Sequence, residues 1–356
     1  IVNSHPILTD NTFESITGAA ISMNLGCNPD IHGVTLIDNG FNGVILDSGT
    51  LSENGFWDDT DLVYRMSGDT TVPPGTTLTI APGMVIKQTY GSYDLIVQGT
   101  LNAPGTESEP IIFTSYRDDT AGGDSNNDAD GPGPYPAIWG GILLTDTSTN
   151  NVIQHAEVRY AGWSIPAAVH VDGAPLSMSN CLLVDSGTSG LRIDASNPTI
   201  TDCTFRGNAS SAAAMDLASN PDIRGVTMDD NARNCITLDS GVLPGDGFWD
   251  DRDIVYRFAG DITVPADAVL TLGEGQIIKA AYGTNDIIIQ GSLLAQGTGA
   301  APVVITSERD DVYGGDTNNS TSSPQAAIWG GLTFQAPSGG NAVDHLIVRY
   351  GGWSIV

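Results

Sequence analysis

One polar segment is rich in oxygen-bearing side chains, which from Asp124 onward fall at every second position, a pattern that can bind a cation. The candidate ligands in this segment are Asp118, Asp119, Asp124, Asn126, Asp128 and Asp130. Ca²⁺ takes about six to eight oxygen ligands, and alternating carboxylates and amides in a tight turn can direct several of them inward. The segment is not an EF-hand: counting from Asn126 puts Gly131 at the sixth position, but Ala137 stands where the twelfth would be glutamate. We therefore expect a short calcium loop, with a solvated acidic loop of Asx turns as the alternative.

A weaker form of this segment occurs later in the chain. Its candidate ligands are Asp310, Asp311, Asp316 and Asn318. Asp128 and Asp130 have no acidic counterpart there, so we expect Ca²⁺ to bind the second segment weakly or not at all. A catalytic metal would not tolerate that difference, whereas an ion that only holds one long loop would. The contrast favours a structural ion.

Paired aspartates could also do chemistry, because a glycoside hydrolase needs two carboxylates across the scissile bond and a lyase needs a cation and a base. The pairs are Asp58-Asp59, Asp118-Asp119, Asp250-Asp251 and Asp310-Asp311. Asp58 to Asp61 follow Phe56-Trp57 where a turn is expected, which favours bonding of their side chains to the backbone. We assign no catalytic residue from the sequence.

Histidine, glutamate and arginine alternate in one expected strand, at His155, Glu157 and Arg159, and would share one face. The second copy keeps the histidine and the arginine but has Ile347 in place of the glutamate. This loss of the carboxylate argues against an acid–base mechanism common to both copies. We expect these histidines and arginines to bond to neighbouring coils or to the acidic loops: His155, His345, Arg159 and Arg349.

All six tryptophans form three pairs at equivalent positions of the two copies. The tryptophans that could offer a flat ring to a sugar are Trp139, Trp329, Trp163 and Trp353. An aromatic ring contributes most to stability when it is buried, so we favour packing at the corners of a coil. A glycan-binding platform is the alternative.

The cysteines carry little chemistry. Four occur, and none aligns with another between the two copies, which excludes a disulfide scaffold. Cys181 and Cys203 lie 22 residues apart at similar positions of a short repeat, where they could stack as thiols or form a disulfide.

A long internal repeat carries all of these groups. The run Asn28-Pro-Asp-Ile-His-Gly-Val-Thr returns as Asn220-Pro-Asp-Ile-Arg-Gly-Val-Thr at an offset of 192, and Ala137-Ile-Trp-Gly-Gly returns from Ala327 at an offset of 190. The chain therefore divides into two tandem units of about 190 residues, 1–192 and 193–356, each of which contains both kinds of motif. Both ends of the chain fall inside a unit.

Short strands are expected throughout each unit. Apolar residues alternate in runs of four to eight that are bounded by Gly, Asn or Pro and recur every twenty-odd residues, a pattern typical of successive turns of a β-solenoid. No convincing helix appears. The sequence predicts an all-β fold in which the two units form one continuous solenoid, with long acidic loops after Ser115 and Ser307.

Three phrases resemble those of bacterial right-handed parallel β-helix proteins, the fold class of pectate lyases and of many large secreted surface adhesins. They are Thr71-Val-Pro-Pro-Gly-Thr-Thr-Leu-Thr-Ile-Ala-Pro-Gly, Ile112-Phe-Thr-Ser-Tyr-Arg-Asp-Asp and Gly122-Gly-Asp-Ser-Asn-Asn-Asp-Ala-Asp-Gly. The resemblance covers nearly the whole chain and implies a right-handed parallel β-helix in an extracellular or cell-surface protein.

Composition excludes several partners. The 42 acidic residues against 13 basic ones give a formal net charge of −29, which disfavours nucleic acid. No run of eighteen apolar residues could span a membrane. The chain begins at Ile1 without a leader, and its ends lack the polar caps of natural solenoids, so we expect it to adjoin flanking units of a longer chain or to pair end to end with copies of itself.

The sequence thus favours a non-enzymatic structural or adhesive module of a repetitive bacterial surface protein or filament, in which Ca²⁺ stabilises the first long loop. The alternatives are a polysaccharide lyase or hydrolase whose active residues come from different coils, and a module that binds glycans through its paired tryptophans.

Overall fold

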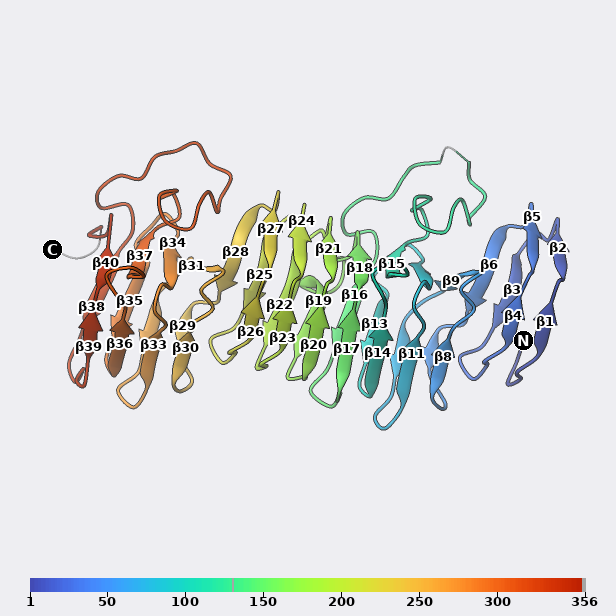
Figure 1. Cartoon of the computed structure of the whole chain (residues 1–356), viewed down its shortest axis with the longest axis horizontal. Helices are drawn as coiled ribbons and strands as arrows, with labels where there is room; N and C mark the ends of the chain where they lie inside the picture. Colours follow the sequence, from blue (N-terminus) through green and yellow to red (C-terminus); the bar gives the residue numbers. More distant parts are fainter. Residues whose placement is uncertain (130, 354–356) are drawn as a thin grey trace. The chain divides into compact units, whose positions relative to one another are not determined.

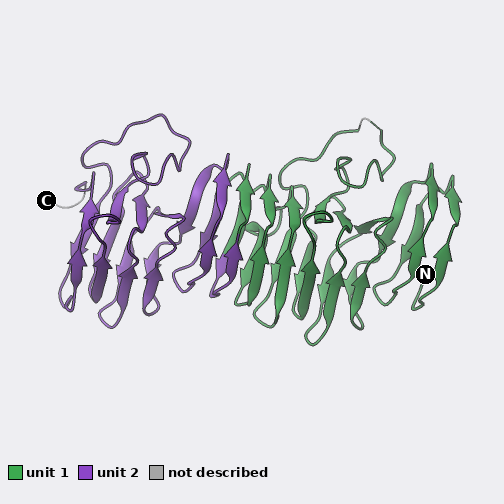
Figure 2. Ribbon diagram, in the orientation of Figure 1, with its two compact units in different colours: residues 1–192, 202–209 green, residues 193–201, 210–356 purple. Residues whose placement is uncertain are grey.

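The computed structural model describes residues 1–129 and 131–353, and every regular element in this part of the chain is a β-strand. The residues form two compact units (Figure 2). Unit 1 contains Ile1–Arg192 and Asp202–Ala209, and unit 2 contains Ile193–Thr201 and Ser210–Val356. The strands carry the alternation seen in the sequence. In β11 (Thr77–Ile80), for example, Leu78 and Ile80 are buried while the threonines face outward.

Each turn of unit 1 contributes three strands, and each strand pairs in parallel with the third strand along the chain (Figure 1). The first wall contains β3 (Ala19–Met23), β6 (Phe41–Leu46), β9 (Val63–Met66), β12 (Val85–Gln88), β15 (Ile111–Ser115), β18 (Ala156–Arg159), β21 (Leu182–Val184) and β24 (Thr204–Arg206). The second wall contains β7 (Gly49–Thr50), β10 (Thr70–Val72), β13 (Asp94–Val97), β16 (Gly141–Leu144) and β19 (Ala167–Asp172). The third contains β8 (Gly55–Trp57), β11, β14 (Thr100–Pro104), β17 (Asn151–Gln154) and β20 (Leu176–Ser179).

The first turns of unit 1 add two short pairs. β1 (Ile7–Thr9) pairs with β4 (Asp30–His32), and β2 (Thr12–Glu14) pairs with β5 (Thr35–Ile37), all in parallel. β22 (Ser189–Asp194) contains the residue at which the first part of unit 1 ends.

Unit 2 repeats this construction. Its first wall contains β25 (Ser211–Met215), β28 (Arg233–Leu238), β31 (Val255–Phe258), β34 (Ile277–Ala280), β37 (Val303–Ser307) and β40 (Leu346–Val348). Its other walls contain β29 (Gly241–Val242), β32 (Ile262–Val264), β35 (Asp286–Ile289) and β38 (Gly331–Phe334), and β30 (Gly247–Trp249), β33 (Val269–Leu272), β36 (Ser292–Gln296) and β39 (Ala342–Asp344). β23 (Thr199–Thr201) pairs with β26 (Asp222–Arg224), and β27 (Thr227–Asp229) follows them along the chain.

The long acidic loops leave the coil where the sequence predicted. β15 ends at Ser115 and β37 ends at Ser307, and in each unit the loop that follows projects from the coil before the chain returns to a strand (Figure 1). Each loop also touches an earlier turn of its own unit. The amide N of Asn42 donates to the carbonyl O of Ser125 at 2.7 Å, and Asn234 donates to Thr317 in the same way at 2.9 Å. The prediction of a parallel β-helix with these two loops is confirmed.

Candidate functional site

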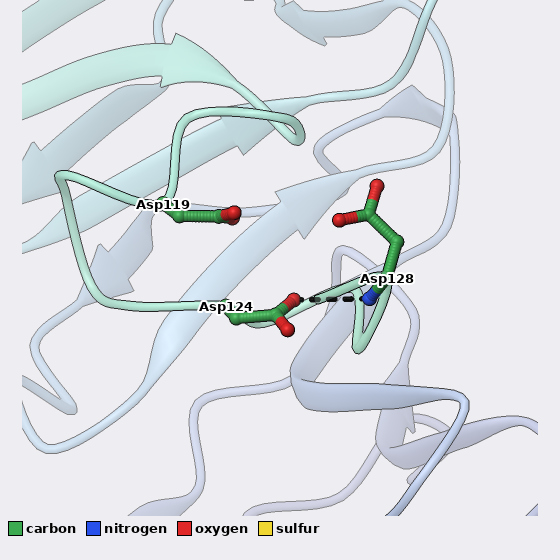
Figure 3. A group of neighbouring side chains, drawn as sticks. All are labelled: Asp119, Asp124 and Asp128. Carbon is green, nitrogen blue, oxygen red and sulfur yellow. Dashed lines mark hydrogen bonds between the residues drawn. The ribbon is translucent and has the colours of Figure 1, made fainter. Parts of the chain in front are cut away.

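Three carboxylates gather on the loop of unit 1. Oxygens of Asp119, Asp124 and Asp128 lie within 4.8 Å of one another (Figure 3). Asp119 and Asp128 are exposed and Asp124 is half-buried. The Asp124 carboxylate accepts the backbone N–H groups of Asp128 at 3.1 Å and of Ala129 at 2.9 Å, which closes the turn between them. The predicted calcium loop therefore brings three of its acids together. Asp130 lies outside the described residues.

The proximity of the three carboxylates contributes to a raised pKa at Asp119. Burial is the largest cause that raises the pKa of its carboxyl group, and the nearby charges of Asp124 and Asp128 raise this pKa further, while the charge of Lys87 lowers it. Like charges held this close favour either a shared proton or a bound cation. The arrangement therefore has the donor chemistry that suits a hard cation such as Ca²⁺.

A buried lysine supports the loop from below. Lys87 on β12 is fully buried, and its Nζ donates to the carbonyl O of Gly123 and to the Oγ of Ser125, both at 2.9 Å. Burial lowers the pKa of this ammonium group, and the charges of the surrounding aspartates partly restore it. Lys279 has the same role in unit 2, where its Nζ donates to the carbonyl O of Gly315.

The two lysines are the only ones in the chain and lie 192 residues apart, the offset of the repeat. Sequence reasoning did not assign them a role, although their rarity and equivalent positions were a usable signal. A lone cation retained in both copies of a strongly acidic chain is expected to neutralise a fixed acidic feature.

Asp118 and Asp310 were predicted as metal ligands, and the structure corrects this. Both side chains are fully buried. Asp118 accepts hydrogen bonds from the hydroxyl groups of Thr114 at 2.7 Å and Thr120 at 2.5 Å, and pairs with Arg159 at 3.1 Å. With both oxygens engaged inside the protein, Asp118 cannot join the exposed group. Burial by itself would raise its pKa, but these hydrogen bonds and the arginine charge outweigh burial and lower it.

Unit 2 forms the same internal contact. Asp310 accepts a hydrogen bond from the hydroxyl of Thr306 at 2.7 Å and pairs with Arg349 at 3.0 Å. The expectation that Arg159 and Arg349 bond to the acidic loops is confirmed. Glu157 also pairs with Arg159, at 2.6 Å. The backbone N–H of His155 donates to the carbonyl O of Ser179 at 3.0 Å, and the side chain of His345 pairs with the adjacent Asp344 at 2.9 Å.

The loop of unit 2 gathers fewer acids. Asp316 accepts the backbone N–H of Asn318, and Asn318 accepts the backbone N–H of Ser320, each at 3.1 Å. Ser320 stands at the position of Asp128, so only Asp311 and Asp316 remain as acids. Within the described ranges, the only group of three or more acidic, histidine or cysteine ligands is the one in unit 1.

The aspartates after β8 and β30 accept hydrogen bonds from the backbone of a strand that has no described strand beside it in the following turn. β4 pairs only with β1, and β8 pairs with β11, so the backbone of β4 faces no strand of the following turn in the described sheets. The Asp59 carboxylate accepts the backbone N–H of Ile31 at 2.7 Å, and Asp61 accepts that of Gly33 at 3.1 Å. Alternate side chains thus supply the acceptors that a strand would have provided.

Unit 2 forms the same side-chain-to-backbone hydrogen bonds between β26 and the turn after β30. Asp251 accepts the backbone N–H of Ile223 at 2.9 Å, and Asp253 accepts that of Gly225 at 3.1 Å. The other oxygen of Asp251 accepts the hydroxyl of buried Tyr256 at 2.6 Å. The predicted side-chain-to-backbone bonding is confirmed.

Each of these turns borders an acid-lined hollow. The hollow of unit 1 has a volume of about 270 Å³ and is lined by residues 28–32 and 58–61. The hollow of unit 2 has a volume of about 430 Å³ and is lined by residues 220–224 and 250–253. Because the second and third aspartates of each turn accept hydrogen bonds from backbone N–H groups, they are not free to act as an acid–base pair across a substrate.

The tryptophans divide into two kinds. Trp139 and Trp329 are 1% and 0% exposed, and each indole N–H donates to a carbonyl of its own unit, that of Arg159 at 2.8 Å and that of Arg349 at 2.7 Å. A buried ring has no face for a ligand, so the alternative of glycan binding at these two positions is wrong. Trp163 and Trp353 are each 44% exposed.

All four cysteines are buried free thiols, and the sulfur of Cys181 donates to the carbonyl O of Ser179 at 3.2 Å. The hydrogen bond with the neighbouring Cys203 thiol, followed by burial, raises the pKa of Cys181. In the part of the chain that the structure describes, no helix has the length and apolar character needed to cross a membrane.

Two family models match the chain. Residues 49–164 match a pectate-lyase-like β-helix domain, and residues 140–244 match a right-handed β-helix region. Neither curated proteins nor solved structures gave a match. The two matched segments overlap and together span 49–244, where the structure has parallel strands that pair with every third strand. The chain therefore folds as a right-handed parallel β-helix, and its residues 49–164 are similar to pectate-lyase-like β-helix domains.

Proposed function

We propose that this chain is a non-catalytic structural module of a repetitive extracellular bacterial surface protein or filament, in which Ca²⁺ holds the long loop of unit 1. The observation that carries the proposal is the use of the repeated acids. Asp59, Asp61 and Asp118 of unit 1, like their counterparts in unit 2, accept hydrogen bonds from the protein itself. These three acids, which are retained in both copies, therefore serve the coil.

The calcium part of the proposal rests on the cluster of Asp119, Asp124 and Asp128. Its carboxylate oxygens already lie within 4.8 Å of one another, and the buried Oδ1 atom of Asn126 beside them has no hydrogen-bond partner among the described residues. Asn126 donates from its Nδ2 to Asp128 at 2.8 Å, which places that unpaired oxygen next to the cluster. This oxygen could coordinate a cation, and the cation would relieve the carboxylate repulsion that, after burial, raises the pKa of Asp119.

Calcium binding is tested by thermal unfolding and titration calorimetry with and without Ca²⁺. With a dissociation constant of about 0.1 mM, as in extracellular modules, 1 mM Ca²⁺ would stabilise the loop by about 1.4 kcal/mol. Asp128→Ser copies the residue of unit 2 and should abolish the heat of binding, whereas Asp311→Asn in unit 2 should leave it unchanged. Equal heats for the wild type and Asp128→Ser would contradict the assignment.

The structural role predicts assembly or flanking units, because the fold buries edges by stacking turns. Negative-stain electron microscopy of the isolated protein should show rods that join end to end. Monodisperse monomers at high concentration would contradict assembly into filaments. The alternative of a polysaccharide lyase is favoured by the match to a pectate-lyase-like domain. Assays on pectin, alginate and related glycans should give no product, and release of unsaturated sugars would replace the structural proposal with the lyase.

A further inference from the structure

Each unit displays one edge-to-face aromatic pair on its surface. The ring centroids of Tyr90 and Trp163 lie 5.0 Å apart at an interplanar angle of 86°, and those of Tyr282 and Trp353 lie 5.0 Å apart at 89°. Both tryptophans are 44% exposed, and the tyrosines are 47% and 55% exposed. Exposing nearly half of an indole forgoes much of the stabilisation that burying it would provide. The chain nevertheless keeps the same exposed pair in both units.

Backbone hydrogen bonds and a glycine fix the main chain at each exposed tryptophan. The N–H of Trp163 donates to the carbonyl O of Trp139 at 3.0 Å, and Gly162 precedes it with a φ of +98°, a conformation that favours glycine. Trp353 donates to Trp329 at the same distance, after Gly352 with a φ of +110°. The main chain of each exposed tryptophan is therefore hydrogen-bonded to that of a buried tryptophan, and its ring packs against a tyrosine. A platform held in this way loses little conformational freedom when a ligand stacks on it.

An arginine accompanies each pair. The guanidinium carbon of Arg117 lies 5.9 Å from the ring centroid of Tyr90, and that of Arg309 lies 5.1 Å from that of Tyr282. Neither arginine forms an ion pair with a carboxylate among the described residues, although acids outnumber bases by 42 to 13. Arg117 donates from Nε to the hydroxyl of Tyr116 at 2.9 Å. This leaves its two terminal nitrogens to donate to a ligand.

We propose that these two surfaces are glycan-binding sites, in which an uncharged pyranose ring stacks on Trp163 or Trp353 and its hydroxyl groups accept hydrogen bonds from Arg117 or Arg309. A pyranose presents a flat face of C–H groups to an aromatic ring and pairs of adjacent hydroxyls to a planar guanidinium fork. The net charge of −29 repels nucleic acids and polyanionic glycans at long range, which favours an uncharged sugar.

The site of unit 1 has one further polar group. The ring of Tyr135 lies 5.9 Å from the guanidinium carbon of Arg117 and is 41% exposed. Its position is occupied in unit 2 by Gln325, which has no aromatic face. Unit 1 therefore binds the same glycan more tightly than unit 2.

The proposal is tested by titrating the full chain with neutral oligosaccharides of glucose, mannose, xylose and galactose, and with oligogalacturonate for comparison, followed by calorimetry and indole fluorescence. We expect two classes of site for a neutral glycan. Trp163→Ala should remove the tighter class, and adding Trp353→Ala should remove both, each with a loss of at least about tenfold in affinity. Phe56→Ala, which truncates an aromatic ring that is 45% exposed at another place in the coil, is the matched control and should change nothing.

The combination of Arg117→Gln and Arg309→Gln keeps both rings and should weaken binding by about tenfold while the circular dichroism spectrum stays that of the wild type. Binding that survives both the double tryptophan and the double arginine variants would overturn the proposal. So would the absence of binding to every neutral glycan, or binding to oligogalacturonate alone. Glycan binding at these surfaces does not require Ca²⁺ or assembly into filaments. A failure of the structural proposal would therefore leave the glycan-binding proposal to be judged by its own titrations.

Discussion

Replacement of Asp59 tests whether its carboxylate substitutes for a missing strand. Asp59 accepts the backbone N–H of Ile31 at 2.7 Å and the hydroxyl of fully buried Tyr64, and is itself only 6% exposed. Asp59→Ala would leave two buried donors without partners, at about 1 to 3 kcal/mol each. Part of this loss is offset, because burial raises the pKa of Asp59 and its charge is costly to keep there. We expect a net local loss of about 2 to 4 kcal/mol.

Native-state hydrogen exchange is the appropriate assay, because long repeat arrays need not unfold in one cooperative step. A loss of about 2.8 kcal/mol corresponds to about a hundredfold faster exchange at the amide of Ile31. Asp59→Asn keeps an oxygen that can accept from Ile31 and should change exchange there by less than about tenfold. Asp251→Ala should have the same effect at Ile223 and none at Ile31. Unchanged protection of Ile31 in Asp59→Ala would refute the interpretation of Asp59 as a strand substitute.

Further perturbations address the loop, the pH dependence and the thiols. Lys87→Met should change the free energy of unfolding by less than about 1 kcal/mol, because burying the ammonium group is itself costly. The variant should nevertheless speed limited proteolysis of residues 116–140. Lys279→Met is the control, and it should leave the proteolysis of residues 116–140 unchanged. Burial raises the pKa of Asp94 to about 6, so the native chain holds this proton more tightly than the unfolded chain, and stability should fall by about 1 to 2 kcal/mol as pH rises from about 4 to 6. Urea unfolding of Asp94→Asn should lack this component, and an identical pH profile would contradict it. Native protein should not react with Ellman's reagent until it unfolds, because all four thiols are buried.

The repeat made much of the fold predictable. Alternation such as that of Thr77 to Ile80 is a local property, and turns without a long loop meet the next turn at a similar separation along the chain. The bonding of Asp59 and Asp61 to the backbone was also predictable, because three aspartates within four residues after a strand commonly form turns. The loops began where the last apolar residues of their strands ended.

The candidate sites were less predictable. The sequence placed the adjacent Asp118 and Asp119 in one set of ligands, yet Asp118 is buried against Arg159 and Asp119 is exposed. The difference arises from the direction of two adjacent side chains at the end of β15, and a loop does not keep the alternation of a strand. Comparison of the two copies helped only where residues changed, as with Glu157.

The sequence by itself therefore determined the coil, the repeat and the positions of the loops, because these follow from local periodicity and from the identity of turn residues. The tertiary structure decided which side chains share a space. It placed Lys87 beneath the acidic loop and buried Trp139 while leaving Trp163 exposed. These outcomes depend on contacts between residues that are 20 to 40 positions apart and on the path of a long loop, neither of which is encoded in the local pattern.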